Sequence, residues 1–570
     1  MFGFGINEKK PLSDVRSAEH WLASLPAKDP LAMNAEVVAQ LEKAAAPSSQ
    51  RSPRGLEAVF RVDTHTAGLR RTLTSQYIEH ASRSSRIEDQ LWQALFDQTQ
   101  AFLQCYQAFA SEIAQNRGSA KWQALLPELV AREIVHRGLD AKIRLYHHEH
   151  WIPARWAELH ALFTRACSQQ IERRPLALQG DARTTTIEHE YLVVTMLQLM
   201  NTGNLTVRNL DWLTEQLDEW CAPLRFTLES SSGTSFYVDL ASRTGLRRRP
   251  PGPLEGRVLF LDTRPLHSSL RQHIVALEQK IRSEPVSDKA ARRSEQLNLL
   301  MKLASQIDPD YRPMPRRGER RAATGTVDAI VGFAKISGYL REEQSSPIPD
   351  HDPSKSFGGT MELAVFGRSR TAPPDRRDEL ARRRLAAFAA VGGAWEVKDV
   401  SQTGFRLLAP MNVANAVSLG ALAAIRPAGQ AEWTLGIVRR MQRLTAERAE
   451  IGLQVIANTL VGVQLHEQRR PSDADYSIDG EPVTFGGRGF HGLFLALRTR
   501  AGGGVVQSLI LPPAEYKPNK RVMLQTAQVS YAVRFGHVLE QEPDWVWAAI
   551  EPIEPVETAA GIPPAAAPAP

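Results

Sequence analysis

The hydrophobic pattern of this chain changes its period near residue 324, and this change constrains the fold more than any other feature. Before that point, apolar side chains recur at spacings near 3.6, the period of an amphipathic helix. In the segment 87–115 they fall at Leu91, Leu95, Phe102, Tyr106 and Phe109. After that point, short segments alternate apolar and polar residues, which is typical of strands with one buried face. The sequence therefore predicts a helical part followed by a β part.

The length of 570 residues requires several domains, and the predicted class is multidomain α+β. Residues 1–310 are expected to form an all-α bundle or array. In residues 311–460, six short strands suit a small antiparallel β-barrel, with an inserted loop at about 341–394. A second small all-β domain is expected over 476–556, and the Pro/Ala-rich tail 557–570 is expected to be disordered.

Composition bears on the compartment more than on the fold. The cysteines Cys105, Cys167 and Cys221 are scattered and odd in number, so neither a disulfide framework nor a CxxC metal site is indicated. The N-terminus becomes charged before an apolar segment of signal-peptide length appears, and no later run approaches the roughly 20 apolar residues of a membrane span. We expect a cytoplasmic protein without membrane insertion.

Arginines gather just before the first strand of the predicted barrel, in RPMPRRGERR at 312–321. Arg317 and Arg321 are four residues apart, and so are Arg316 and Arg320, and Arg312 and Arg316. The sequence leaves the register of this RxxxR element open, because an arginine-rich stretch also produces such pairs by chance.

A second motif lies in DVSQTGFRLL, which places Asp399, Ser401 and Gly404 between two strand-like runs. A hairpin alone accounts for these residue types, since Asp and Ser bond to nearby backbone groups and Gly supplies a positive φ. Ligand binding is the alternative, because Gly also lets a backbone approach another group closely.

Taken together, the RxxxR element before a strand, the DxSxxG hairpin and the later strands in WTLGIVRR and AEIGLQVI resemble the PilZ domain, the bacterial receptor domain for cyclic di-GMP. The resemblance covers roughly residues 312–460. It implies a ligand site made of Arg316, Arg317, Arg320, Arg321, Asp399, Ser401 and Gly404.

The chemistry of the ligand fits these residue types. A cyclic dinucleotide carries two phosphates and two guanines, and arginine pairs bidentately with phosphate or with guanine O6 and N7 and stacks on bases. A carboxylate such as Asp399 accepts from guanine N–H groups, and Ser401 can bond a phosphate or a base edge.

One feature departs from the usual PilZ pattern, in which a short strand and turn separate the two motifs. Here a long insertion lies between them, although a longer loop adds only about 0.6 kcal/mol of closure free energy per doubling. Alternatively, the cluster from Arg376 to Arg384 lies nearer Asp399. That cluster contains no RxxxR pair and reads as a basic helix packed on the barrel.

The resemblance implies a signalling receptor that binds cyclic di-GMP and relays it to an unidentified protein partner, with no cofactor. A degenerate PilZ protein that serves as an interaction scaffold is the alternative. A nucleic-acid binder using the arginines at 247–249 and 376–384 is less supported, because exposed aromatic stacking residues are not evident.

Neither catalysis nor metal binding is indicated. No Walker A, Rossmann or GxSxG motif occurs, so we expect no enzyme. His147, His148, Glu149, His150 and His160 lie close in sequence but lack the spacing that presents zinc ligands on one helix face.

Overall fold

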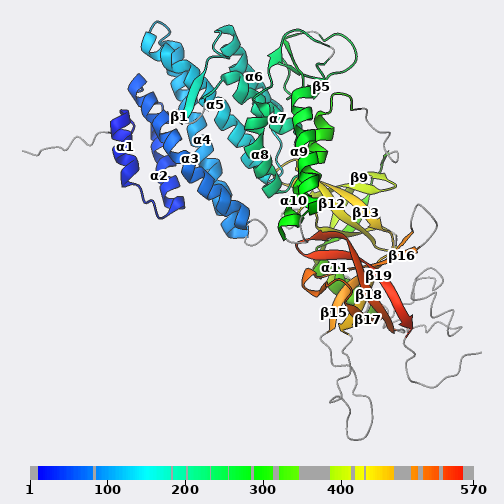
Figure 1. The fold of residues 1–570 in the computed structure, drawn as a ribbon. Helices are drawn as coiled ribbons and strands as arrows, with labels where there is room; N and C mark the ends of the chain where they lie inside the picture. The colour runs from blue at the N-terminus through cyan, green and yellow to red at the C-terminus, as the bar shows by residue number, and fades with distance from the viewer. Residues whose placement is uncertain are drawn as a thin grey trace, which may run out of the picture. The chain divides into compact units, whose positions relative to one another are not determined.

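The computed structural model describes residues 10–80, 85–181, 184–200, 203–231, 233–254, 256–283, 288–311, 320–345, 386–389, 391–411, 417–428, 430, 432–467, 489–498, 505–525 and 530–555. The chain forms two compact units, Met1–Met314 and Pro315–Pro570 (Figure 1). The first unit is mainly helical and the second is built mainly from strands, as the change of period predicts.

Helices of the first unit lie side by side in an array (Figure 1). Their bounds are α1 Val15–Ser24, α2 Pro30–Ala45, α3 Pro53–His80, α4 Ser85–Gln115, α5 Ala120–Tyr146, α6 Pro153–Ser168, α7 Ile187–Met200, α8 Val207–Cys221, α9 Arg264–Ser283 and α10 Asp288–Ile307. Polar residues mark several helix starts: the Asp29 side chain accepts from the backbone N–H groups of Leu31 and Ala32, and Pro30 occupies the first turn.

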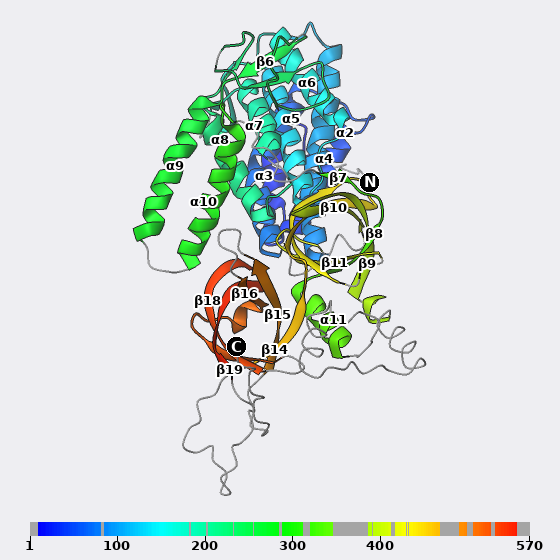
Figure 2. The same cartoon turned by 90° about the vertical axis from the view of Figure 1, so that its right-hand side faces the viewer.

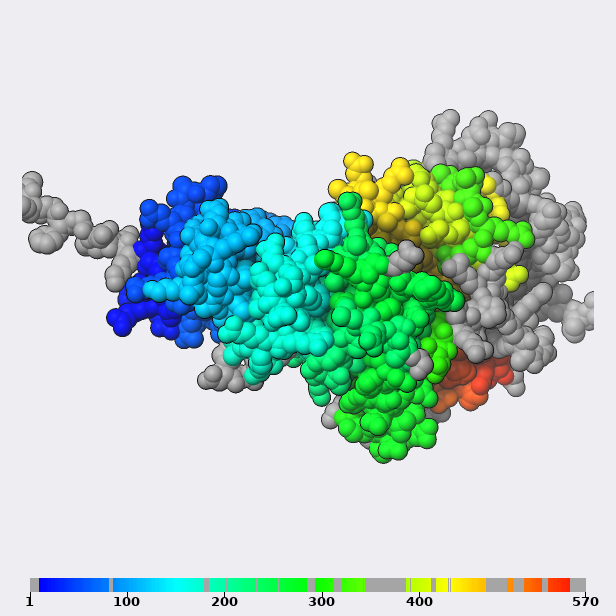
Figure 3. All heavy atoms as spheres, turned by 90° about the horizontal axis from the view of Figure 1, so that it is seen from above, coloured from blue at the N-terminus to red at the C-terminus, as the bar shows by residue number. Residues whose placement is uncertain are grey.

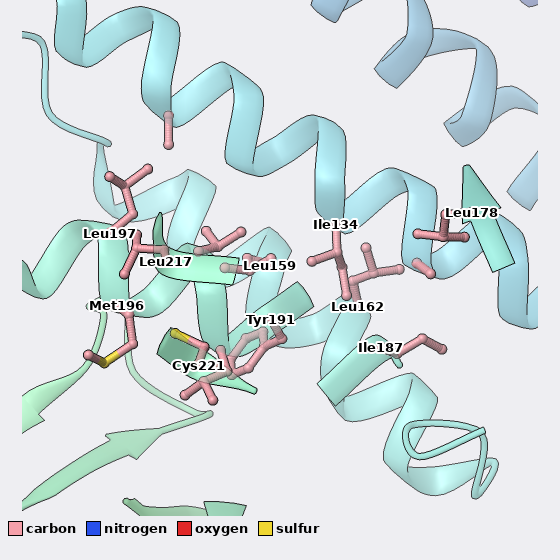
Figure 4. Packing of buried hydrophobic residues seen from close by; sticks show 14 of the residues in the cluster. Ile134, Leu159, Leu162, Leu178, Ile187, Tyr191, Met196, Leu197, Leu217 and Cys221 are labelled. Atoms are coloured by element: carbon pink, nitrogen blue, oxygen red, sulfur yellow. The ribbon is translucent and has the colours of Figure 1, made fainter. Parts of the chain in front are cut away.

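The predicted stripe of α4 is confirmed, because Leu91, Leu95, Phe102, Tyr106 and Phe109 are all buried. Figure 4 shows how the core continues between α5, α6, α7 and α8, where Tyr191, Leu162 and Leu159 lie together. Cys105 and Cys221 are buried in this core, and all three cysteines are free thiols.

Two small sheets complete the first unit. Strands β1 (Leu176–Asp181) and β2 (Thr184–Thr185) form one antiparallel pair. The other sheet has the order β3-β6-β4-β5, with bounds β3 Phe226–Thr227, β4 Phe236–Asp239, β5 Arg247–Arg248 and β6 Val258–Leu261.

The second unit contains the predicted six-stranded antiparallel barrel. Its strands are β8 Thr326–Val331, β9 Gly392–Ser401, β10 Gly404–Pro410, β11 Leu422–Pro427, β12 Thr434–Arg443 and β13 Arg448–Ala457. They run in the order β10-β13-β12-β11-β8-β9, and pairing of β9 with β10 closes the ring. A short strand, β7 (Arg321–Ala322), adds to β9. The core includes Trp395, Leu407, Ile425, Ile451 and Val438.

The sequence reads 325–336 as one strand, but the structure has β8 followed by the helix α11 (Phe333–Ser345). Gly332 has φ 93° between them, a conformation that ends the strand and that glycine adopts at little steric cost. The inserted loop is therefore shorter than 341–394 at both ends, since α11 reaches Ser345 and β9 begins at Gly392. Residues 346–385 lie outside the described part of the chain.

A second closed antiparallel barrel follows, with the order β14-β15-β16-β19-β18-β17. Its bounds are β14 Val461–Glu467, β15 Gly489–Arg498, β16 Val505–Leu511, β17 Arg521–Gln525, β18 Ser530–Glu542 and β19 Trp545–Pro555. The second all-β domain is confirmed, but it begins before residue 476, because β14 pairs with both β15 and β17. The tail from 556 lies outside the described residues.

The two barrels share a hydrophobic cluster within this unit. It combines Ile336 and Leu340 of α11 with Ile437 of β12 and with Leu493 and Trp545 of the second barrel. Figure 2 shows α11 beside β14. Among the described residues, the helices are too short or too polar to cross a lipid bilayer.

Candidate functional site

The two sequence motifs meet on β9, although 79 residues separate Arg320 from Asp399. Strands β7 and β8 both pair antiparallel with β9, with Arg321 opposite Val400 and Thr326 opposite Glu396. The chain that follows the arginine element therefore runs along β9 and brings that element to the β9–β10 hairpin. The insertion lies after α11, so its length does not keep the two motifs apart in space.

Asp399 joins two arginines from different parts of the chain, one just before β7 and one on β10. Arg320 Nη1 donates to Asp399 Oδ1 at 3.1 Å, and Arg406 Nε lies 2.6 Å from Asp399 Oδ2. The aspartate side chain is only 10% exposed, whereas those of Arg320 and Arg406 are 48% and 42% exposed. The carboxylate thus anchors two guanidinium groups that remain accessible to solvent.

Sequence reasoning missed Arg406. It lies directly opposite Asp399 on β10, in the register that begins with Gly404 opposite Ser401. This register follows from a two-residue connection at 402–403, so the hairpin motif itself contained the signal. Arg406 Nη1 also lies 3.7 Å from Glu450 Oε2 on β13.

A β-bulge at Lys398 follows this pair, because Arg406 pairs with Asp399 while Leu407 pairs with Val397. Leu407 is buried in the barrel core, whereas Arg406 is partly exposed. Residues directly opposite each other in an antiparallel pair lie on the same side of the sheet, so Asp399 shares the side that carries Arg406.

Ser401 and Gly404 serve the hairpin itself in this structure. Ser401 Oγ donates to the carbonyl oxygen of Gly404 at 3.2 Å. Gly404 does not have the positive φ that the sequence suggested. Its requirement is steric, because a Cβ there would lie 2.4 Å from the carbonyl oxygen of Leu453 on β13.

The remaining arginines divide between described and undescribed residues. Arg320 and Arg321 are exposed, and Arg321 begins β7. Arg312, Arg316 and Arg317 lie outside the described residues, as do residues 376–384. Of the RxxxR pairs, the structure therefore describes one member each of the pairs 316/320 and 317/321, and it is Arg320 that contacts Asp399.

A hollow of about 600 Å³ borders the hairpin and includes Val400 and Phe405, which pair with each other across β9 and β10. Glu432 is the one charged residue among its described lining residues. The described lining of this hollow therefore offers no positive charge to an anionic ligand.

Several side chains of the predicted histidine cluster have protein partners. The ring of His147 stacks on Trp92 at 4.3 Å, and Glu149 accepts from Arg144. His160 is buried between Tyr191 and the backbone of Thr244.

Elsewhere, the possible ligand atoms of His189, Glu190 and Asp218 lie within 4.8 Å of one another. His189 is ion-paired with Asp218 at 2.9 Å, and Glu190 accepts from Thr185, so this cluster satisfies its own polar groups.

Of the arginines at 247–249, Arg248 has a structural role. Arg248 donates to the carbonyl oxygens of Gln306 and Asp308 at the end of α10, and its guanidinium lies over the rings of Phe236 and Tyr311. Because these contacts occupy part of its donor set, the Arg248 guanidinium has fewer N–H groups left to bind a polyanion.

Comparison with known proteins gives a match for the helical part of the chain. Residues 16–231 match the family model described as the N-terminal domain of the cyclic-di-GMP receptor FimW. No curated protein and no solved structure matches the chain. The matched residues lie within the first unit and end well before the barrel that resembles a PilZ domain. The chain is therefore similar to a cyclic di-GMP receptor with a helical N-terminal region.

Proposed function

We propose that this protein is a cytoplasmic receptor that binds cyclic di-GMP at the first barrel and relays it to a protein partner. One observation carries the proposal: Arg320, from the arginine element, is ion-paired with Asp399 of the DxSxxG hairpin. The family match of residues 16–231 supports the same ligand from a separate part of the chain. The protein acts by binding rather than by catalysis.

In the proposed site, Asp399 positions the two arginines that meet the ligand. Arg320 donates one N–H to the carboxylate and Arg406 is ion-paired with it, so each guanidinium keeps further N–H groups for phosphate or guanine. On binding, Asp399 also accepts from a guanine N–H, while Ser401 and Gly404 hold the hairpin tip in place.

Charge balance shows why the whole arginine element is needed. Arg320 and Arg406 carry two positive charges, and Asp399 and Glu450 carry two negative ones, so these four groups are balanced. A dinucleotide brings two phosphate charges into this neutral site. Further cations must compensate them, and Arg316, Arg317 and Arg321 are the candidates that the sequence places beside Arg320.

The same balance favours a second candidate function. Asp399 is already satisfied by two guanidinium groups, as in an ion pair that only stabilises the barrel. In that case the barrel is a scaffold for protein interaction and binds no nucleotide.

Calorimetric titration of the full chain with cyclic di-GMP separates the two functions, with GTP and cyclic di-AMP as specificity controls. We expect Arg320→Ala and Asp399→Asn to weaken binding about tenfold or more, the equivalent of ~1.4 kcal/mol. Comparing Arg316→Ala with Arg317→Ala tests which RxxxR register contributes. Arg448→Ala is the matched control, because Arg448 forms an exposed ion pair with Glu396 on the same barrel.

Unchanged affinity in Arg320→Ala and Asp399→Asn contradicts the proposed site. Absence of heat in the wild-type protein at high micromolar ligand contradicts the receptor function and supports the scaffold.

A further inference from the structure

A hollow of about 670 Å³ lies on the helical unit, between the C-terminal half of α6 and the segments around β4 and β6. Thr164, Arg165 and Ser168 line it from α6, and Ser242, Arg243 and Arg257 line it from the other side. The cyan and green parts of this unit border each other in the space-filling view (Figure 3). Three arginines and three hydroxyl groups thus face one hollow.

None of these three arginine side chains forms an ion pair with a described residue. Two carboxylates on α6 and β4 have other partners: Glu158 pairs with Arg137, and Asp239 accepts from the backbone N–H of Ala241. Arg165 lies in the last turn of α6, where a cation also interacts favourably with the helix dipole. The helix dipole cannot balance the charges of Arg243 and Arg257, because these two residues lie outside helices.

The walls of the hollow are held in place by a buried histidine. Tyr191 Oη donates to His160 Nδ1 at 2.8 Å, so the other ring nitrogen, Nε2, carries the proton and donates to the carbonyl oxygen of Thr244 at 2.9 Å. Burial lowers the pKa of His160, in agreement with a neutral ring. Gly245 packs against Trp156 so closely that a Cβ there would lie 2.5 Å from the indole ring. The loop that carries Ser242 and Arg243 is therefore fixed against α6 before any ligand arrives, which lowers the entropy cost of binding.

We propose that this arginine hollow binds an acidic peptide segment of the partner protein, with its carboxylates paired to Arg165, Arg243 and Arg257. The proposal rests on the receptor function above, because it assigns the surface and the chemistry of the partner. The floor of Ala157, Ala161 and Leu240 accommodates a small apolar side chain between the acidic ones.

Two features favour a peptide over other anions. All three arginines are exposed, so a bound group stays partly in water, whereas small-molecule pockets bury most of their ligand. No aromatic residue occurs among the described residues that line the hollow, so bases of a single-stranded nucleic acid have no stacking platform there.

Fluorescence anisotropy of the full chain tests the proposal with a labelled peptide rich in Glu and Leu and with its Glu→Gln counterpart. We expect the acidic peptide to bind and the neutral one not to bind. The triple variant Arg165→Gln/Arg243→Gln/Arg257→Gln should weaken binding roughly tenfold or more, since exposed pairs contribute modestly but add up. The matched control is Arg208→Gln/Arg271→Gln/Arg282→Gln, which removes the same charge from exposed positions on α8 and α9.

Equal loss in the control triple overturns the proposal, because it indicates non-specific attraction. Efficient competition by inorganic pyrophosphate or by an RNA oligonucleotide also overturns it, in favour of a phosphate or nucleic-acid site.

Cyclic di-GMP titration of the same triple variant keeps the two proposals distinguishable. Retained nucleotide affinity shows that the variant is folded and that the hollow is separate from the nucleotide site. Acidic-peptide binding without any nucleotide binding leaves this surface standing while the receptor function fails.

Discussion

At the residue scale, the Asp63 side chain in the core of the helical unit has four polar partners. Its carboxylate accepts from Arg70, Arg132 and Tyr106 at 2.8–2.9 Å and lies 3.0 Å from His136 Nε2. Burial by itself would raise the pKa of Asp63, but the neighbouring His136, Arg70 and Arg132 hold it well below its ordinary value. The carboxylate stays ionised in the folded protein because its partners offset its desolvation.

Asp63→Asn should therefore destabilise the helical unit by about 3–5 kcal/mol, because it leaves buried Arg132 without its main counter-charge. Since the folded pKa is depressed, the stabilisation by Asp63 is complete above its unfolded pKa of about 3.9 and is lost as the pH falls through the lower folded value. Urea unfolding at a series of pH values measures both effects. Glu19→Gln is the control, since it removes only an exposed pair with Arg61. A variant as stable as the wild type, with the same loss of stability in acid, contradicts this role.

The sequence predicts the residues of a site where a short local motif contains them, but not where the site brings together residues that are distant in sequence. Asp399 was identified from its hairpin, and Arg406 was identifiable by extending the register of that hairpin by two residues. Nothing local to Asp63 points to Arg132, which is 69 residues away, or to His136, because their meeting depends on how α3 packs against α5.

At the element scale, the β9–β10 hairpin is fixed from outside by β13. Gly404 lies opposite Gln454, and a Cβ at Gly404 would meet the Leu453 carbonyl oxygen at 2.4 Å, well inside van der Waals contact. Gly404→Ala should therefore push β10 from β13 and destabilise the second unit by about 1–3 kcal/mol. Chemical unfolding of the full chain, monitored by tryptophan fluorescence, provides the measurement.

Gly338→Ala is the matched control in the same unit. Gly338 lies inside α11 with no heavy atom within 4 Å of an added Cβ, so alanine should stabilise the protein by about 0.5–1 kcal/mol. A Gly404→Ala variant as stable as the wild type would show that β10 and β13 adjust to the added Cβ. Close approach of a ligand would then be the reason for glycine at this position.

The elements themselves were predictable to different degrees. Strand alternation indicated the first barrel and a second all-β domain, whereas α11 was read as a continuation of β8. Its signals were Gly332 and the helical spacing of Phe333, Ile336 and Leu340, all of which are buried. A short helix that packs against a sheet has an apolar face that resembles strand alternation over a few residues, and the glycine was the better guide.

At the scale of the second unit, the two barrels are joined by polar as well as apolar contacts, which the sequence did not reveal. Trp545 Nε1 donates to the carbonyl oxygen of Gly420, and Arg439 on β12 forms two hydrogen bonds with Glu540 on β18. Arg439 Nε also donates to Gln454, the residue opposite Gly404. A chain of contacts therefore runs from the candidate nucleotide site to the second barrel. Arg439 and Glu540 lie 101 residues apart in sequence, beyond the reach of any local pattern.

A double-mutant cycle at Arg439 and Glu540 tests whether this link couples the barrels. The pair is bidentate but only partly buried, so we expect a coupling free energy of about 1 kcal/mol between Arg439→Ala and Glu540→Ala in urea unfolding. Arg534 and Glu551 are the matched control, because they pair across β18 and β19 within the second barrel and are more exposed. If the effects of Arg439→Ala and Glu540→Ala add within about 0.3–0.5 kcal/mol, this ion pair does not contribute to barrel association.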